Sequence, residues 1–333
     1  MLSNIITSSR AKTYNTCRRL HYYKYALGYR PVKTSSALSF GTLVHAGLEA
    51  WWGWHKLPIE MSALDRALSE IDLKALESEN IDQFEIAKAK TLLCGYDTRW
   101  SPTMEDLDVL GVEMEFQTTL LHPDQGTVLA LDLAGKIDSL ARRKSTGKIW
   151  LVEHKTTSED LSLGAPYWQR LRMDPQVSIY FDGALSLGYP IEGCIYDVVA
   201  KFKERPLLAT PADKRKVTKE GKLYAGQRAQ DETVEEFRAR LAESMAKSPE
   251  SFFGRAEVTR TEDELREAER DTYEIAMSMI DDEREGRRPR NPDACFKYNR
   301  LCDFYTVCSG CGAIDDDNFV QLATPHQELK TIP

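Results

Sequence analysis

The chain has 333 residues, of which 42% are hydrophobic and 29% are charged, with a formal net charge of −8. This length and composition are typical of a soluble globular protein with one large domain or two ordinary ones, and the negative charge argues against a protein that coats nucleic acid without specificity. No apolar run approaches the roughly 18 residues that span a bilayer, and residues 1–10 lack the apolar stretch of a signal peptide. We therefore expect a cytoplasmic protein with no membrane partner.

Hydrophobic periodicity predicts helices in the first hundred residues and alternating strands after them. The expected elements, in chain order, are helices at 10–30, 40–55, 61–78 and 81–99, strands at 109–121, 127–142 and 148–156, a helix at 173–188, a strand at 191–201, and helices at 231–247 and 261–286. The second and third strands are joined by a short turn at 145–147 and so form an antiparallel hairpin. This order predicts an α/β fold with a mixed central sheet flanked by helices.

The hairpin carries two carboxylates and a lysine, with Asp138 on one strand and Glu153 and Lys155 on the next. Alternate residues of a strand point to the same face, so Glu153 and Lys155 face one way and His154 the other, while Asp138 can meet Glu153 across the hairpin. Such a cluster on an apolar strand is costly unless something binds there. A divalent cation suits the carboxylates and can activate a water at a phosphate, while the lysine can orient or deprotonate that water or steady negative charge. The pattern favours phosphodiester hydrolysis, but the same spacing is common on ordinary strands.

Residues 201–222 break the alternation with a basic segment. It contains eight lysines and arginines against three acids, which gives a net charge of +5. Two interpretations stay open: a solvated surface loop, and a loop that contacts phosphates near the site.

Seven cysteines are present: Cys17, Cys94, Cys194, Cys295, Cys302, Cys308 and Cys311. In a reducing cytosol they do not form a disulfide framework. Cys94 and Cys194 stand singly in apolar surroundings, and we interpret them as buried packing residues. The crowding of four cysteines within 295–311 indicates a metal site, because thiolates suit iron–sulfur clusters or zinc.

Four short motifs resemble, in order and spacing, the RecB-like branch of the PD-(D/E)XK nucleases. They are G-x-x-x-H at 41–45, G-x-I-D at 135–138, E-x-K at 153–155 and Q-x-x-x-Y at 176–180. The resemblance implies a restriction-endonuclease-like core and a metal-dependent nuclease.

The resemblance also implies roles for individual residues. The implied ligands of Mg²⁺ or Mn²⁺ are His45, Asp138, Glu153 and the backbone carbonyl of His154. The implied catalytic residues are Asp138, Glu153, Lys155, Gln176 and Tyr180. Glu113 stands where many members of the branch have a strand glutamate just before the hairpin.

The cysteines resemble those of the iron–sulfur exonucleases of this class, in which one early cysteine and three late ones ligate a 4Fe–4S cluster that joins the two ends of the chain. The implied ligands here are Cys17, Cys295, Cys302 and Cys308. The step from Cys295 to Cys302 is longer than the family usually shows, which leaves Cys311 as the alternative to Cys295. A structural Zn²⁺ on the four late cysteines is a further alternative, and it would leave Cys17 without a role. A set of free thiols with a purely structural role is another.

The resemblance covers roughly residues 8–311 and predicts one nuclease domain over 1–333. Its expected parts are an N-terminal helical part at 1–100, a catalytic core at 101–205, a basic loop and helices at 206–290, and the cysteine segment at 291–312. The N-terminal part would contribute Cys17 and His45.

The implied activity is exonucleolytic cleavage at DNA ends, single-stranded or duplex, in recombination, repair, CRISPR adaptation or phage DNA metabolism, in the cytoplasm of a bacterial, archaeal or phage-infected cell. The sequence has no G-x-x-x-x-G-K-[ST] motif, so a partner helicase would supply any unwinding. Two alternatives stay open: a non-catalytic nucleic-acid-binding subunit of a helicase–nuclease complex, and a structure-specific endonuclease.

Overall fold

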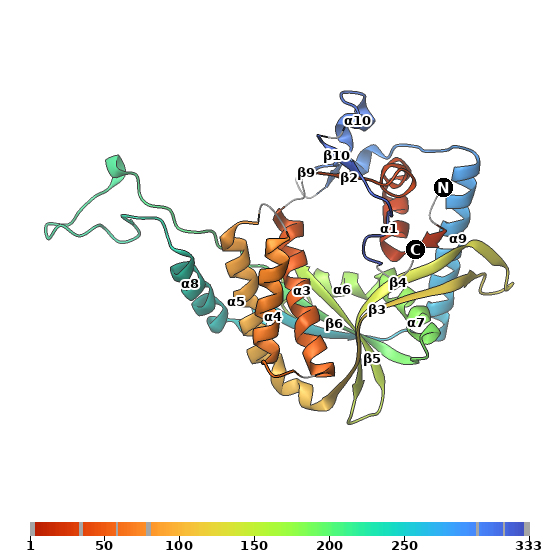
Figure 1. Cartoon of the computed structure of the whole chain (residues 1–333), viewed down its shortest axis with the longest axis horizontal. Coiled ribbons are helices and arrows are strands. Elements are labelled where there is room, and N and C mark those ends of the chain that lie inside the picture. Colours follow the sequence, from red (N-terminus) through yellow and green to blue (C-terminus); the bar gives the residue numbers. More distant parts are fainter. Residues whose placement is uncertain are drawn as a thin grey trace.

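A mixed six-stranded sheet forms the centre of the protein (Figure 1), in a computed structural model that describes residues 4–32, 36–57, 59–77, 81–297, 300–315 and 317–329. The strands are β1 (Ile5–Ile6), β3 (Leu107–Leu121), β4 (Val128–Arg143), β5 (Ile149–Thr157), β6 (Ile191–Ala200) and β7 (Phe253–Val258). β3 and β5 pair antiparallel with β4, and β1 pairs parallel with it. β5 and β6 are parallel, and β7 is antiparallel to β6. The predicted α/β fold with a mixed sheet is confirmed.

Helices cover both faces of this sheet (Figure 1). One face carries α3 (Ser36–Lys56), α4 (Ala63–Leu76), α5 (Gln83–Trp100) and α8 (Val234–Lys247). The other face carries α1 (Ser8–Thr16), α6 (Pro166–Arg172), α7 (Pro175–Ser186) and α9 (Glu262–Arg284). Two hydrophobic cores result, and β5 contributes Val152 to the first and Leu151 to the second, because successive strand residues point to opposite faces. Within the described residues, no helix has the length and apolar character needed to cross a membrane.

Capping side chains set the starts of several helices. Thr233 and Thr261 each form a reciprocal capping box with the glutamate three residues later, at the starts of α8 and α9. Asp174 caps α7, because its carboxylate accepts a hydrogen bond from the N–H of Gln176, and Pro175 is the first helical residue. The cap therefore fixes the position of Gln176 at the edge of the sheet.

The single helix predicted at 10–30 is wrong. The chain breaks at Cys17, whose backbone is extended (φ −164°, ψ 116°), between α1 and α2 (Arg18–His21). A π-helical turn at Tyr22–Ala26 follows, and Gly28 at φ +75° then turns the chain into β2 (Tyr29–Pro31). Cys17 therefore lies at a kink and not inside a helix.

Segments near the two ends of the chain pack against each other. β2 pairs antiparallel with β10 (Phe319–Gln321). The rings of Tyr23 and Phe304 stack with centroids 5.0 Å apart, and those of Phe304 and Phe319 stack at 4.9 Å. Since all three rings are buried, this ring stack is a small core of its own that joins the two regions.

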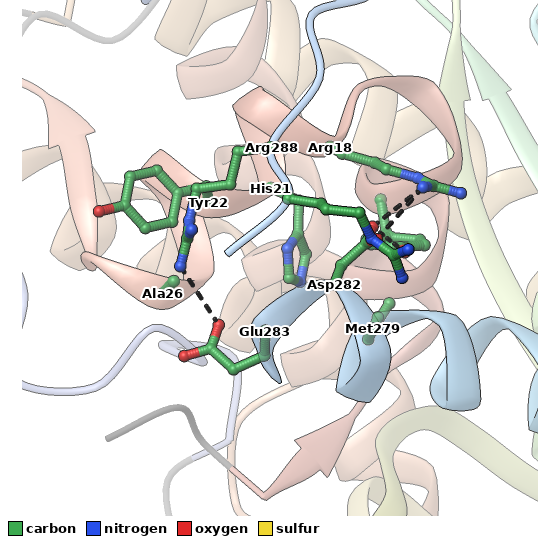
Figure 2. Close-up of a pocket in the computed structure, with 10 residues that line it drawn as sticks. Arg18, His21, Tyr22, Ala26, Met279, Asp282, Glu283 and Arg288 are labelled. Carbon is green, nitrogen blue, oxygen red and sulfur yellow. Dashed lines mark hydrogen bonds and ion pairs between the residues drawn. The ribbon is translucent and has the colours of Figure 1, made fainter. Parts of the chain in front are cut away.

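A second junction connects α1 and α2 with α9 around the buried carboxylate of Asp282, and Figure 2 shows it in close-up. The Tyr14 hydroxyl donates to Asp282 Oδ2 at 2.5 Å, and the guanidinium groups of Arg18 and Arg287 lie 3.1 and 2.9 Å from the carboxylate. The cavity that these side chains line measures about 20 Å³. Because its polar groups bond one another, we interpret it as a structural clamp.

A long arm separates β6 from α8 and projects from the body of the protein (Figure 1). We name residues 203–231 the basic arm. It contains only a 3₁₀ turn at Ala212–Lys214 and one isolated bridge between Val217 and Leu223. The break in alternation predicted for 201–222 therefore corresponds to a real departure from the sheet.

Candidate active site

The candidate site begins where β4 and β5 separate. Their antiparallel pairing runs from the turn to Ser139 opposite Val152. The next residue on β4 is Asp138, whose Oδ2 accepts a hydrogen bond from the backbone N–H of His154 at 2.8 Å. A side-chain oxygen thus replaces a backbone acceptor and holds the acid against β5, close enough to Glu153 for the two charges to interact.

Glu153, Lys155 and two residues of α7 form one hydrogen-bonded chain. The Lys155 Nζ lies 2.7 Å from Glu153 Oε1 and donates to Gln176 Oε1, also at 2.7 Å. The amide of Gln176 donates to Glu153 Oε1 and to the Tyr180 hydroxyl, each at 2.8 Å. Glu153 and Lys155 therefore share the face of the sheet that α7 covers, as the strand alternation predicted.

Glycine makes room for Tyr180 beneath β4. A Cβ atom on Gly135 would lie 2.8 Å from the Phe116 ring and 3.1 Å from the Tyr180 ring. A Cβ atom on Gly183 would lie 2.4 Å from Phe116. The Phe116 and Tyr180 rings meet edge to face at 5.8 Å. The glycine of the G-x-I-D motif thus allows the aromatic packing that positions α7.

Burial is the main influence on the pKa values of the two carboxylates of the site, and it raises both. Burial, followed by the charge of Asp138, raises the pKa of Glu153 to about 7. Burial likewise raises the pKa of Asp138. Burial disfavours the charge of Lys155, but the neighbouring Glu153 carboxylate outweighs it and raises the pKa of the lysine. Lys155 is therefore a fixed positive charge and not a proton acceptor at neutral pH.

His45 on α3 and Glu113 on β3 lie near these groups. Burial, followed by the nearby His154 ring, lowers the pKa of His45 to about 4, so its imidazole is neutral and has a lone pair to donate. Glu113 has φ 51°, the left-handed region that a glutamate rarely adopts, and its carboxylate forms an ion pair with Lys136. The pairs on either side of it in the β3–β4 ladder put Glu113 opposite Asp138.

His154 points to the other face of β5, where a buried network receives it. Its Nδ1 lies 3.4 Å from Asp197 Oδ2 on β6. The guanidinium of Arg255 donates to both oxygens of Asp197 at 3.2 Å, and Tyr96 and Trp52 continue the network. Sequence reasoning missed Asp197, although a single aspartate inside the apolar strand at 191–200 is a signal for such a partner.

The fit of a divalent cation can be tested on the donor atoms. Within the described residues no group of three or more His, Cys, Asp or Glu side chains could hold a metal ion as it stands. However, Glu153 Oε2 is buried and has no hydrogen-bond partner, which is costly for a carboxylate oxygen. Carboxylate oxygens are the donors that Mg²⁺ and Mn²⁺ prefer, so the two carboxylates fit the ion, whereas the imidazole of His45 is a less usual ligand for Mg²⁺.

Four cysteines line one cavity between the two ends of the chain. They are Cys17, Cys295, Cys302 and Cys308, and the stacked rings of Tyr23 and Phe304 line the same cavity. The N–H of Cys302 donates to the carbonyl of Cys295 at 2.8 Å, which fixes that pair of residues. The cavity measures about 20 Å³, room for little more than one water, and within the described residues these cysteines do not form a group that could hold a metal ion as they stand.

The other cysteines are placed differently. Cys311 is exposed and lines a separate pocket with Asp315 and Phe319. Cys194 is fully buried in the core, as expected for a packing residue, whereas Cys94 is half-buried on α5. All seven cysteines are free. Cys295 lines the same cavity as Cys17, and Cys311 lines another pocket.

The comparisons with known proteins agree with this geometry. A family model described as "PD-(D/E)XK nuclease superfamily" matches residues 6–309. No curated protein matches the chain. Among solved structures, the chain is similar to a "Putative exonuclease" from Eubacterium rectale, with 12% identity, 94% of this chain and 90% of that chain covered, and a TM-score of 0.48. A protein named SSO0001 covers 70% of this chain and 85% of its own, with 13% identity and a TM-score of 0.24. At these scores neither likeness bears on function.

Proposed function

The chain belongs to the PD-(D/E)XK nuclease superfamily, and on this premise we propose that it is a metal-dependent exonuclease that hydrolyses phosphodiester bonds at DNA ends. The observation that carries the proposal is the set of hydrogen bonds that links Glu153, Lys155 and Gln176 beside Asp138, with one oxygen of Glu153 left buried and unpartnered. Such an arrangement costs stability, and a bound cation would compensate for it.

The roles that we propose are those that the resemblance to the family implies, and the unpartnered Oε2 of Glu153 supports them. His45, Asp138, Glu153 and the carbonyl of His154 would hold the Mg²⁺ or Mn²⁺ ion. When bound, the ion would polarise the phosphate and acidify a water. Lys155 keeps its proton and places positive charge where the phosphate becomes more negative.

The residues of α7 would orient the lysine. Gln176 accepts a hydrogen bond from Lys155 and donates one to Glu153, so it fixes the distance between the two charges. Tyr180 holds the Gln176 amide in turn. Both are proposed to act at the catalytic lysine, and Tyr180 acts through Gln176.

We also propose that Cys17, Cys295, Cys302 and Cys308 ligate an iron–sulfur cluster of the 4Fe–4S type. Their convergence on one cavity supports this ligand set, and thiolates are the donors that such clusters require. The cavity would have to widen to admit the cluster, so the side chains of the four cysteines must move on assembly.

The experiment that tests the activity is an assay on anaerobically purified protein with end-labelled single-stranded and duplex DNA, with Mg²⁺, with Mn²⁺, and with EDTA. Stepwise shortening from one end that requires the metal would support the proposal. Internal cutting would point to the endonuclease alternative, and DNA binding without any cleavage would point to the non-catalytic subunit.

A further inference from the structure

The basic arm contributes nothing to the hydrophobic core. From residue 203 to residue 231, no side chain is buried. The flanking residues Phe202 and Glu232 are both buried, so the arm leaves and re-enters the body at defined points. Ordering a backbone costs roughly 1–2 kcal/mol per residue, and burial within this chain does not offset that cost here. A partner outside the chain is the natural source of compensation.

The arm nevertheless has a defined backbone conformation, because its two halves are joined by backbone hydrogen bonds. Thr210 N–H donates to the Arg228 carbonyl at 2.9 Å, and Tyr224 N–H donates to the Lys216 carbonyl at 3.0 Å. At the tip, Thr218 N–H donates to the Lys222 carbonyl at 2.7 Å. These bonds hold the arm as an antiparallel ribbon that presents its tip away from the body (Figure 1).

The tip of the ribbon is strongly basic. Residues 214–224 contain five lysines and arginines and a single acid, Glu220, in a chain whose net charge is −8. Arg215 bonds the carbonyls of Thr210 and Ala229 and so serves the ribbon itself. The tip has four lysines, at positions 214, 216, 219 and 222. None of their side chains forms an ion pair with a described residue. Unpaired lysines on one exposed ribbon suit a polyanion.

The root of the arm adjoins the candidate active site. The N–H of Lys201 donates to the carbonyl of Thr157 at 2.7 Å, and Thr157 lies two residues beyond Lys155 on β5. The Lys201 ammonium lies over the ring of Phe40 on α3, five residues before His45. The ribbon thus starts at the edge of the sheet that carries the catalytic lysine.

We propose that the basic arm binds the phosphate backbone of the nucleic-acid substrate outside the active site and so determines how tightly long substrates are held. This inference rests on the proposed function, because the substrate must be a nucleic acid. Single strands and duplexes share the phosphate chemistry, and Tyr224 at the tip, 53% exposed, offers a ring on which only an unpaired base can stack.

The test compares two variants of the full chain with equal changes in net charge. The arm variant replaces Lys214, Lys216, Lys219 and Lys222 with Gln. The control variant replaces exposed lysines away from the arm and the site with Gln, namely Lys74, Lys144, Lys148 and Lys247. Affinity for a labelled single strand and for the matching duplex is measured in EDTA over a range of salt concentrations.

For the arm variant we expect the dissociation constant to rise on the order of tenfold or more. The slope of log affinity against log salt concentration should become shallower, by about 0.9 per lost phosphate contact on duplex DNA and about 0.7 on single strands. The kcat on a very short oligonucleotide should stay unchanged, while KM on long substrates rises. Tyr224→Ala weakens binding further only if the arm holds single strands.

Equal salt dependence in the arm and control variants would overturn the inference while leaving the proposed function intact. A change of sedimentation coefficient in the arm variant, with unchanged nucleic-acid binding, would also overturn it and would point to an acidic protein surface as the partner. If the unaltered chain binds no nucleic acid at all, the proposed function itself fails.

Discussion

The Oδ2 atom of Asp138 accepts a hydrogen bond from the backbone N–H of His154, just beyond the last β4–β5 pair, Ser139 with Val152. Asp138→Asn keeps an acceptor at this position and removes the charge, whereas Asp138→Ala removes both. Since loss of a metal ion costs several kcal/mol of transition-state stabilisation, both variants should lose cleavage on the order of 10³-fold or more. Single-turnover cleavage measures the loss, and melting temperature should fall only in the alanine variant.

DNA binding is the control for this pair of variants. Both should still bind end-labelled DNA in EDTA, because the phosphate contacts elsewhere are unchanged. If either variant cleaves at the rate of the unaltered chain, Asp138 is not a metal ligand.

The raised pKa of Glu153 should make the metal-free protein more stable on the acid side. Burial and the charge of Asp138 raise this pKa from 4.5 to about 7, so the folded state keeps a proton that the unfolded state releases. The free energy of unfolding should therefore fall as the pH rises from 4.5 to 7, by up to about 3 kcal/mol. Urea denaturation in EDTA across this range measures the fall, and Asp138 adds a contribution of the same sign.

Glu153→Gln provides the matched variant, since glutamine does not titrate. In this variant, most of the fall in the free energy of unfolding between pH 4.5 and 7 should disappear. Above pH 7 the variant should be more stable than the unaltered chain. An undiminished slope in the variant would show that the pH dependence comes from other groups.

The cysteine proposal separates the late cysteines into two classes. Cys302→Ala and Cys308→Ala should each lose bound iron and sulfide and lower the melting temperature, because cluster binding is coupled to folding. Cys311→Ala should retain both, since Cys311 lies in a separate exposed pocket. Iron and labile sulfide are measured on anaerobically purified protein. Loss of iron from Cys311→Ala, together with its retention in Cys295→Ala, would exchange the roles of Cys295 and Cys311.

The network behind His154 should be important for stability. Asp197 is fully buried, and its two oxygens receive Arg255. Asp197→Ala leaves that guanidinium buried without its partner, so we expect a loss of about 3–5 kcal/mol. The neighbouring ion pair between Arg143 and Glu257 is exposed, so Glu257→Gln should cost less than about 1 kcal/mol. If Asp197→Ala lowers the free energy of unfolding no more than Glu257→Gln does, the buried network is dispensable for stability.

Local patterns were sufficient to predict which side chains of the candidate site lie on a common face. Strand alternation put Glu153 and Lys155 on one face because that period depends only on the chain itself. The helical spacing of Gln176 and Tyr180 likewise gave their shared face, and the two side chains bond each other.

Features that depend on distant partners were not predictable. The kink at Cys17 interrupts a stretch with helical periodicity, and the ring stack and the β2–β10 pair that surround it need residues almost three hundred positions away. The pairing of Asp197 with Tyr96 and Arg255 likewise requires the folded sheet. The basic arm was visible as a run of charge, but its projection from the body was not, because exposure depends on what the rest of the chain fails to cover.

The stack of Tyr23, Phe304 and Phe319 has a consequence for how the cysteines find one another. Cys17 and Cys302 are far apart along the chain, so bringing them together carries the entropic cost of closing a very large loop. The packed rings, together with the β2–β10 pair, meet that cost as part of folding, and both cysteines then line the same cavity. On the proposed ligand assignment, we therefore expect the packed rings to form first and the cluster to stabilise the junction that they make.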